Sequence, residues 1–182
     1  HEASEFDKLL EINRYPITEL TIHPRVRQDF YKAGPGADFA AALPRCSMPV
    51  CYNGDLITER DVSTVSERYP DLPAVMIGRA LIADPSLVAR LTGGKAADAK
   101  NAETFHDTLF MRYCEAFGDS RIAMLRMKEI WFYHLNLFEN SEKTGKAIKK
   151  AKNTAEFQSA AAAVFRNCRV RANAVPLWFK PA

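Results

Sequence analysis

The sequence has no apolar run long enough for a membrane-spanning helix. Such a helix needs about 20 consecutive apolar residues, and no stretch of these 182 residues approaches that length. Residues 1–5 include two glutamates, whereas a secretory signal begins with basic residues followed by an apolar segment. We therefore expect a protein with no membrane partner and a cytoplasmic location.

Cysteine is scarce, and its spacing argues against small domains that are stabilised by zinc or by disulfide bonds. The four cysteines, Cys46, Cys51, Cys114 and Cys168, form no Cys-x-x-Cys pair. Neither a zinc knuckle nor a disulfide framework is indicated. We expect reduced thiols that behave as small buried apolar side chains rather than as nucleophiles, and no metal site.

The composition is that of a folded soluble protein, with 47% hydrophobic and 26% charged residues. The net charge of +3 is unevenly distributed along the chain. Residues 1–97 carry 11 basic and 13 acidic side chains, whereas residues 98–182 carry 14 basic and 9 acidic ones. The excess of positive charge in the second half favours an acidic partner, of which nucleic acid is the commonest.

Three short apolar runs organise the first half of the chain, at residues 19–25, 49–55 and 74–81. Each run ends in glycine or polar residues, and segments with helical patterns separate them. This alternation predicts consecutive βα units and a parallel sheet. Because parallel strands end at the same edge, we expect one rim to collect the residues that follow the runs: His23, Arg25, Asn53, Gly54, Gly78 and Arg79.

Helix signals appear between the runs and throughout the second half. Thr58, followed three residues later by Asp61, is an N-terminal capping pattern and predicts a helix over residues 58–69. Further helices are expected over residues 4–14, 39–43, 102–117, 120–138 and 154–166. The pair Gly93-Gly94 marks the best boundary, giving domains at residues 1–93 and 98–182, the second a small bundle of antiparallel helices.

Taken together, these motifs resemble the FMN-dependent tRNA-dihydrouridine synthases. The matching segments are Thr-Ile-His-Pro-Arg at 21–25 with Phe-Tyr at 30–31, Tyr-Asn-Gly-Asp-Leu at 52–56, Val-Met-Ile-Gly-Arg-Ala-Leu at 75–81 with Asp-Pro at 84–85, and Met-Leu-Arg-Met-Lys at 124–128 with Trp-Phe-Tyr at 131–133. Each segment alone is a weak signal. Their order and spacing over nearly the whole chain make the resemblance specific.

The resemblance implies a fold and an activity. It implies an α/β chain in which residues 1–93 are the last three βα units of a (β/α)8 TIM barrel that binds FMN, and residues 98–182 are an all-α helical bundle that binds tRNA. The activity implied is the FMN-dependent reduction of uridine to 5,6-dihydrouridine in tRNA, with NADPH or NADH as the expected reductant.

The resemblance also assigns residues to roles. For the cofactor, it implies contacts from His23, Asn53, Gly54, Asp55, Gly78 and Arg79. For tRNA, it implies contacts from Arg25, Arg27, Arg126, Lys128 and Arg169. The physical chemistry agrees, because loops after the last two strands of such barrels form phosphate sites, and an arginine offers two donors that match phosphate geometry.

The sequence departs from the family pattern in one respect that bears on catalysis. In this family a cysteine in an Asn-x-Gly-Cys-Pro loop acts as general acid, and none of the four cysteines here lies in such a loop. We therefore expect the C-terminal portion of a synthase, with no catalytic residue of its own and inactive alone. Strand edges exposed in a partial barrel also predict a homo-oligomer.

The sequence is also compatible with two other functions. The chain could be a non-catalytic nucleic-acid-binding module whose βα units serve only as scaffold, or another FMN-dependent barrel oxidoreductase. Some residues also have a simpler structural interpretation. His23 could be a hydrogen-bonded histidine of the rim, Asn53-Gly54 a turn, and the lysines over residues 143–152 a solvated helix face.

Overall fold

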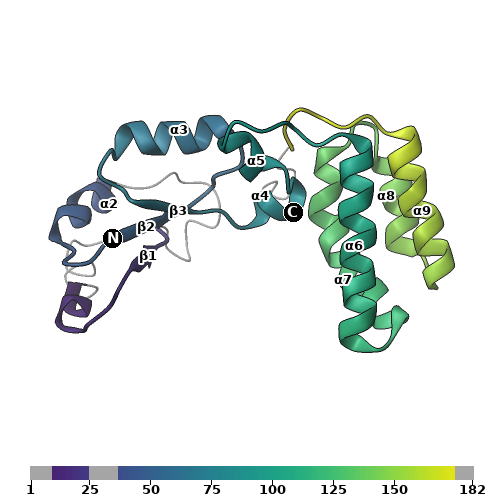
Figure 1. The fold of residues 1–182 in the computed structure, drawn as a ribbon, viewed down its shortest axis with the longest axis horizontal. Helices are drawn as coiled ribbons and strands as arrows, with labels where there is room; N and C mark the ends of the chain where they lie inside the picture. The colour runs from purple at the N-terminus through teal and green to yellow at the C-terminus, as the bar shows by residue number, and fades with distance from the viewer. Residues whose placement is uncertain (1–9, 25–36, 175–182) are drawn as a thin grey trace. The chain divides into compact units, whose positions relative to one another are not determined.

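The computed structural model of the protein describes residues 10–24 and 37–174. The contacts divide the chain into two compact units, His1–Gly78 and Arg79–Ala182. The first contains a sheet with helices, and the described part of the second is mainly helical (Figure 1).

The first unit contains a three-stranded parallel sheet in the order β1-β2-β3. The strands are β1 (Leu20–Ile22), β2 (Val50–Asn53) and β3 (Ala74–Met76) (Figure 1). The register places Ile22 beside Tyr52 and Asn53 beside Met76. The predicted mixed α/β chain with three parallel strands is confirmed, while the assignment of these strands to a (β/α)8 barrel stays a prediction.

Helices follow the strands in the first unit: α2 (Ala37–Ala42) after β1 and α3 (Glu59–Arg68) after β2, with the short 3₁₀ helices η1 (Leu10–Arg14) and η3 (Leu43–Arg45). The predicted cap of α3 is confirmed. The Asp61 amide donates to the Thr58 hydroxyl at 3.2 Å, and the Thr58 amide donates to the Asp61 carboxylate at 2.8 Å. Of the helix expected over residues 4–14, the described part is η1, and residues 4–9 lie outside the description.

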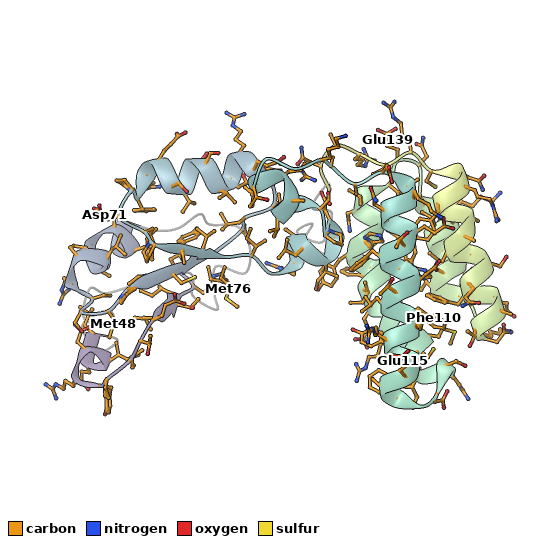
Figure 2. All side chains as sticks on the ribbon, in the orientation of Figure 1. Met48, Asp71, Met76, Phe110, Glu115 and Glu139 are labelled. Atoms are coloured by element: carbon orange, nitrogen blue, oxygen red, sulfur yellow. The ribbon has the colours of Figure 1, made fainter. Side chains whose placement is uncertain are left out.

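The main apolar cluster of the first unit lies on one face of the sheet. Ile22, Val50 and Tyr52 point to this face and pack with Phe39 of α2 and Val65 of α3. The strands alternate, so their intervening residues belong to the other face. Met76 is one of these, and its side chain is 50% exposed and projects away from α3 (Figure 2).

The second unit contains helices α4 (Arg79–Ala83), α5 (Leu87–Leu91), α6 (Ala99–Phe117), α7 (Ser120–His134), α8 (Glu142–Lys150) and α9 (Thr154–Asn167), with the 3₁₀ helix η4 (Leu135–Leu137) (Figure 1). Helices α6 to α9 share one apolar core, in which Trp131 and Phe157 are fully buried. Gly118 ends α6 with a φ of 62°, a left-handed conformation that glycine adopts without the penalty of a side chain.

Helices α4 and α5 belong by their contacts to the second unit. The His134 ring of α7 bonds the Ala83 carbonyl at 3.0 Å, and the Arg90 guanidinium donates to the Asn173 side chain at 3.0 Å. The compact units therefore divide between Gly78 and Arg79, earlier than the boundary predicted at residues 93–98. A glycine pair marks a weak local preference, but it does not determine on which side the preceding helices pack.

Candidate functional site

The carboxyl ends of the three strands form one edge of the first unit. Because the strands are parallel and adjacent, one edge collects His23, which directly follows β1, Asn53, which ends β2, and Gly54, which comes next. Gly78 comes two residues after the end of β3. The sheet thus brings these predicted residues to a common rim. Arg79 comes directly after Gly78 in the chain and begins α4 in the second unit.

A hydrogen bond joins the ends of the first two strands. The Nδ1 atom of His23 lies 2.8 Å from the backbone oxygen of Asn53. This contact occurs one position beyond Ile22 and Tyr52, the last paired residues of β1 and β2. The side chain of His23 therefore extends the pairing of the two strands at the rim, while the residue itself is exposed to solvent.

The two predicted glycines of the rim have different reasons to lack a side chain. A Cβ atom on Gly54 would overlap the hydroxyl group of Tyr52, which is itself buried. Among the described residues, and apart from its two chain neighbours, a Cβ atom on Gly78 would meet no atom within 4 Å. Packing of the protein thus explains Gly54, whereas Gly78 leaves an open surface that a ligand could approach closely.

A cavity of about 290 Å³ opens beside this edge. Its lining includes His23, Gly54 and Asp55 from the rim, together with the residues Asp61, Thr64, Val65, Arg68 and Tyr69 on and after α3. The contribution of α3 to this site was not predicted from the sequence. The spacing of these residues could have revealed it. Positions 61, 64, 65 and 68 follow the i, i+3, i+4, i+7 pattern of one helix face, which is the face that buries Val65.

The polar groups of the cavity differ in whether they already have a partner within the protein. The Asp61 carboxylate accepts from the amides of Ile57 and Thr58 at 3.0 and 2.8 Å, so it belongs to the helix cap. The Arg68 guanidinium lies 5.4 Å from the centre of the Tyr69 ring, a cation–π contact. The buried Tyr69 hydroxyl has no hydrogen-bond partner among the described residues.

Cys51 lies in the central strand, two residues before Asn53, but it lacks the character of a nucleophile. Its side chain is buried, and this burial raises the pKa of the thiol. A raised pKa keeps the thiol protonated at neutral pH, and the thiolate is the reactive form. All four cysteines are free in the structure; Cys51 and Cys168 are buried, whereas Cys46 and Cys114 are half-buried.

The predicted RNA-contacting residues have different environments. Arg25 and Arg27 lie outside the described residues. Arg126 forms an exposed ion pair with Glu129, with N–O distances of 3.0 and 3.1 Å. Lys128 donates to the backbone oxygens of Lys149 and Ala151 and so caps the end of α8.

Arg169 and the lysines of α8 remain exposed to solvent. Lys143, Lys146 and Lys150 follow the i, i+3, i+7 spacing of one helix face, opposite the buried Gly145 and Ile148. From the sequence alone, these lysines are equally consistent with a solvated helix face. Among the described residues no ion pair or hydrogen bond engages their ammonium groups, whereas Lys128 and Arg126 have partners within the unit.

The described part of the chain contains neither a metal-binding cluster nor a membrane-spanning helix. In residues 10–24 and 37–174, no group of three or more His, Cys, Asp or Glu side chains could hold a metal ion. Over the same ranges, no helix combines the length and apolarity needed to cross a membrane.

Comparison with known proteins identifies the family. A sequence model of the family described as dihydrouridine synthase (Dus) matches residues 5–174. A search of curated proteins gave no match to the chain. The matched range includes the three strands with their polar rim and also helices α6 to α9. The chain therefore belongs to the dihydrouridine synthase family.

Proposed function

We propose that the chain serves in the FMN-dependent reduction of uridine to 5,6-dihydrouridine in tRNA. One observation carries the proposal: in a chain of the dihydrouridine synthase family, the parallel order β1-β2-β3 gathers His23, Asn53 and Gly54 at one edge. Ligands of parallel α/β sheets bind outside the carboxyl ends of the strands. A cytoplasmic location follows from tRNA as the substrate.

The residues at the edge fit a flavin nucleotide. Gly78 leaves room for the close approach of a phosphate group, because a Cβ atom there would meet no described atom within 4 Å beyond its chain neighbours. Arg79 belongs to the second unit and is assigned to the phosphate by the resemblance alone, since a guanidinium fork suits phosphate geometry. We assign the cofactor contacts to the residues His23, Asn53, Gly54, Asp55, Gly78 and Arg79. When bound and reduced, FMN would supply the hydride that reduces the uracil ring, and NADPH or NADH is the expected source of its electrons.

The general acid of the reaction is assigned to no residue of this chain. The sequence contains no Asn-x-Gly-Cys-Pro loop, and the thiol of Cys51 is buried with a raised pKa. We therefore propose that these residues hold the cofactor and the RNA but do not reduce uridine by themselves. Reduction of tRNA uridine by the purified 182-residue chain would contradict this assignment.

We assign RNA binding to the helical second unit. Its exposed cations include Arg126, Arg169 and the α8 lysines at positions 143, 146 and 150. Protein cations that neutralise phosphates release counterions, so such binding weakens steeply with salt. Arg25 and Arg27 are assigned to the RNA by resemblance alone, because they lie outside the described residues.

Self-association is a further part of the proposal. Within the described sheet, β1 and β3 each pair with one neighbour, so each presents an edge that can recruit another strand. We expect dimers or larger assemblies through these edges. Light scattering that gives the mass of a single chain at high protein concentration would count against this expectation.

Two titrations test the proposed function. The purified chain is titrated with FMN, followed by flavin fluorescence, and separately with tRNA at several salt concentrations. Binding of both ligands, with tRNA affinity falling steeply with salt, is the expected result. Flavin binding without RNA binding would favour another FMN-dependent oxidoreductase, and salt-dependent RNA binding without flavin would favour a non-catalytic module. Binding of neither ligand would reject the proposal.

A further inference from the structure

Asn53 is the only asparagine in the sequence that is followed by glycine. In an Asn-Gly pair, the backbone nitrogen of the glycine can attack the side-chain carbonyl carbon of the asparagine and close a five-membered succinimide ring. Glycine favours the attack because no side chain hinders the approach. The sequence therefore places the pair most prone to this reaction at the end of β2, on the rim of the sheet.

Neither reacting group has a partner among the described residues. Asn53 is half-buried, and its side-chain amide makes no hydrogen bond within the described part of the chain. The backbone amide of Gly54 likewise has no acceptor there. The side chains of Asn13 and Asn136, by comparison, donate to backbone oxygens at 2.8 and 2.6 Å and are held in place. Asn53 thus differs from these asparagines in its surroundings as well as in its neighbour.

Packing fixes glycine at position 54. A Cβ atom there would overlap the hydroxyl group of Tyr52, which is 2% exposed and packs edge-on against Phe39. Any other residue would slow the ring closure, but it would first have to displace this buried side chain. The core of the first unit thus keeps the reactive neighbour beside Asn53.

The pair lies at a strand end, and this position decides how fast it can react in the folded chain. Asn53 is the last residue of β2, where it pairs with Met76, and its backbone oxygen accepts from Nδ1 of His23 at 2.8 Å. This pairing holds the two reacting atoms apart. Gly54 lies beyond the ladder, however, and the end of a strand opens at a low free energy without unfolding the unit. We therefore expect ring closure that is slower than in an unfolded chain but continues in the folded one.

From these observations we propose that Asn53 is a site of spontaneous deamidation in the folded chain. The bond between the Gly54 nitrogen and the Cγ atom of Asn53 forms, the bond between Cγ and Nδ2 breaks, and ammonia leaves with the hydrogen that the Gly54 amide gives up. Water then opens the ring at either carbonyl carbon, which leaves aspartate or isoaspartate at position 53. Solvent water is the only co-reactant, and no group is oxidised or reduced.

The modification changes the charge and the geometry of the rim, and its effect on ligand binding rests on the proposed FMN cofactor. Either product replaces a neutral amide by a carboxylate two residues before Asp55, and this charge repels the phosphate of FMN. In isoaspartate the chain continues through the former side chain, so the carbonyl group that accepts from His23 becomes a free carboxylate. Both changes act against binding of an anionic cofactor at this edge.

Peptide mass spectrometry of the aged, folded chain measures the reaction. Trypsin releases residues 46–60 as one peptide, in which Asn53 is the only side-chain amide, so the mass gained on exchange of NH2 for OH reports this residue alone. We expect this peptide to convert before the peptide of residues 129–143, which contains Asn136 and Asn140. Conversion should be faster at higher pH, because the attacking nitrogen must lose its proton. A sample digested at time zero corrects for conversion during the digestion.

Two controls make the measurement decisive. The same chain unfolded in urea gives the rate without the restraint of the strand, and the variant Asn53→Gln, whose closure would need a larger ring, should show no gain in mass. Conversion in urea with none in the folded chain would overturn the inference, because the strand would then protect the pair completely. Conversion of Asn140 ahead of Asn53 in the folded chain would overturn it as well.

The effect on the cofactor is tested separately with the variant Asn53→Asp, which carries the charge of the product. It should bind FMN about tenfold more weakly than Asn53→Gln, and the difference should be smaller for riboflavin, which lacks the phosphate. Equal FMN affinity of the two variants would overturn the stated effect on binding. Absence of FMN binding by the unmodified chain would reject the proposed cofactor, while the mass spectrum would still decide whether Asn53 deamidates.

Discussion

The carboxylate of Asp84 lies 2.7 Å from the guanidinium of Arg90, and these side chains are only 2% and 9% exposed. Asp84 also accepts from the Ser86 hydroxyl at 2.6 Å, and Arg90 donates to Asn173, 83 residues further along the chain. A charge buried in this way depends on its partner, because removal of one leaves the other without compensation.

Replacement of Arg90 by methionine should therefore destabilise the second unit strongly. The Asp84 carboxylate would stay buried without its cation, at a cost of about 3–5 kcal/mol. Urea unfolding followed by circular dichroism measures the loss. The matched control is Arg112→Met, because Arg112 and Glu115 form an exposed pair at 3.8 Å and such pairs contribute less than about 1 kcal/mol. Equal effects of the two substitutions would contradict a stabilising role for the buried pair.

Acid should weaken the fold through His134. Burial lowers the pKa of this histidine to about 4, although the bond to the Ala83 carbonyl acts in the opposite direction. The unfolded chain takes up this proton near pH 6.5. Stability from the neutral ring is thus complete above about pH 6.5 and is lost as the pH falls toward 4, in total about 3 kcal/mol. Burial also lowers the pKa of His106, which adds to the effect.

The measurement is the free energy of unfolding in urea between pH 7.5 and pH 4. The variant His134→Gln can keep a donor for the Ala83 carbonyl but has no ionisable group. It should be less stable than the parent at pH 7.5 and should lose less stability on acidification. Carboxyl groups titrate in both proteins, so the difference between the two profiles isolates His134. Parallel profiles would show that the ring does not titrate as expected.

Substitutions of the two rim glycines should separate binding from folding. In Gly78→Ala the added methyl group meets no atom of the described part of the chain within 4 Å beyond the neighbouring residues. We therefore expect an unchanged unfolding midpoint but FMN binding at least about tenfold weaker. In Gly54→Ala the methyl group would overlap the Tyr52 hydroxyl, and we expect a loss of about 1–3 kcal/mol of stability. Unchanged FMN affinity in Gly78→Ala would remove this glycine from the cofactor site.

Two lysines of the second unit should respond differently to replacement by methionine. Lys128→Met removes the bonds to the backbone oxygens at the end of α8 and should cost about 1 kcal/mol of stability. Lys146→Met removes an exposed charge, so stability should be unchanged. If Lys146 contacts a phosphate, its loss should weaken tRNA binding and reduce the salt slope by about one. Urea unfolding and tRNA titrations over a range of salt concentrations distinguish the two roles.

Features encoded by residues close in the chain were predicted well. The cap formed by Thr58 and Asp61 spans three residues, and the three parallel strands follow from short apolar runs that end in polar residues. The rim residues His23, Asn53 and Gly54 could be named for the same reason. The Dus family match over residues 5–174 agrees with the motifs from which the resemblance was first drawn.

The sequence by itself thus determined the three strands, the cap of α3 and the residues at the strand ends, because these depend on neighbours within about one helical turn or a few strand positions. Only the tertiary structure decided which partner each polar group has. His23 bonds an oxygen 30 residues away, and Lys128 caps a helix that ends more than 20 residues later. Such pairs are set by how the elements pack, and packing brings together residues that no local pattern connects.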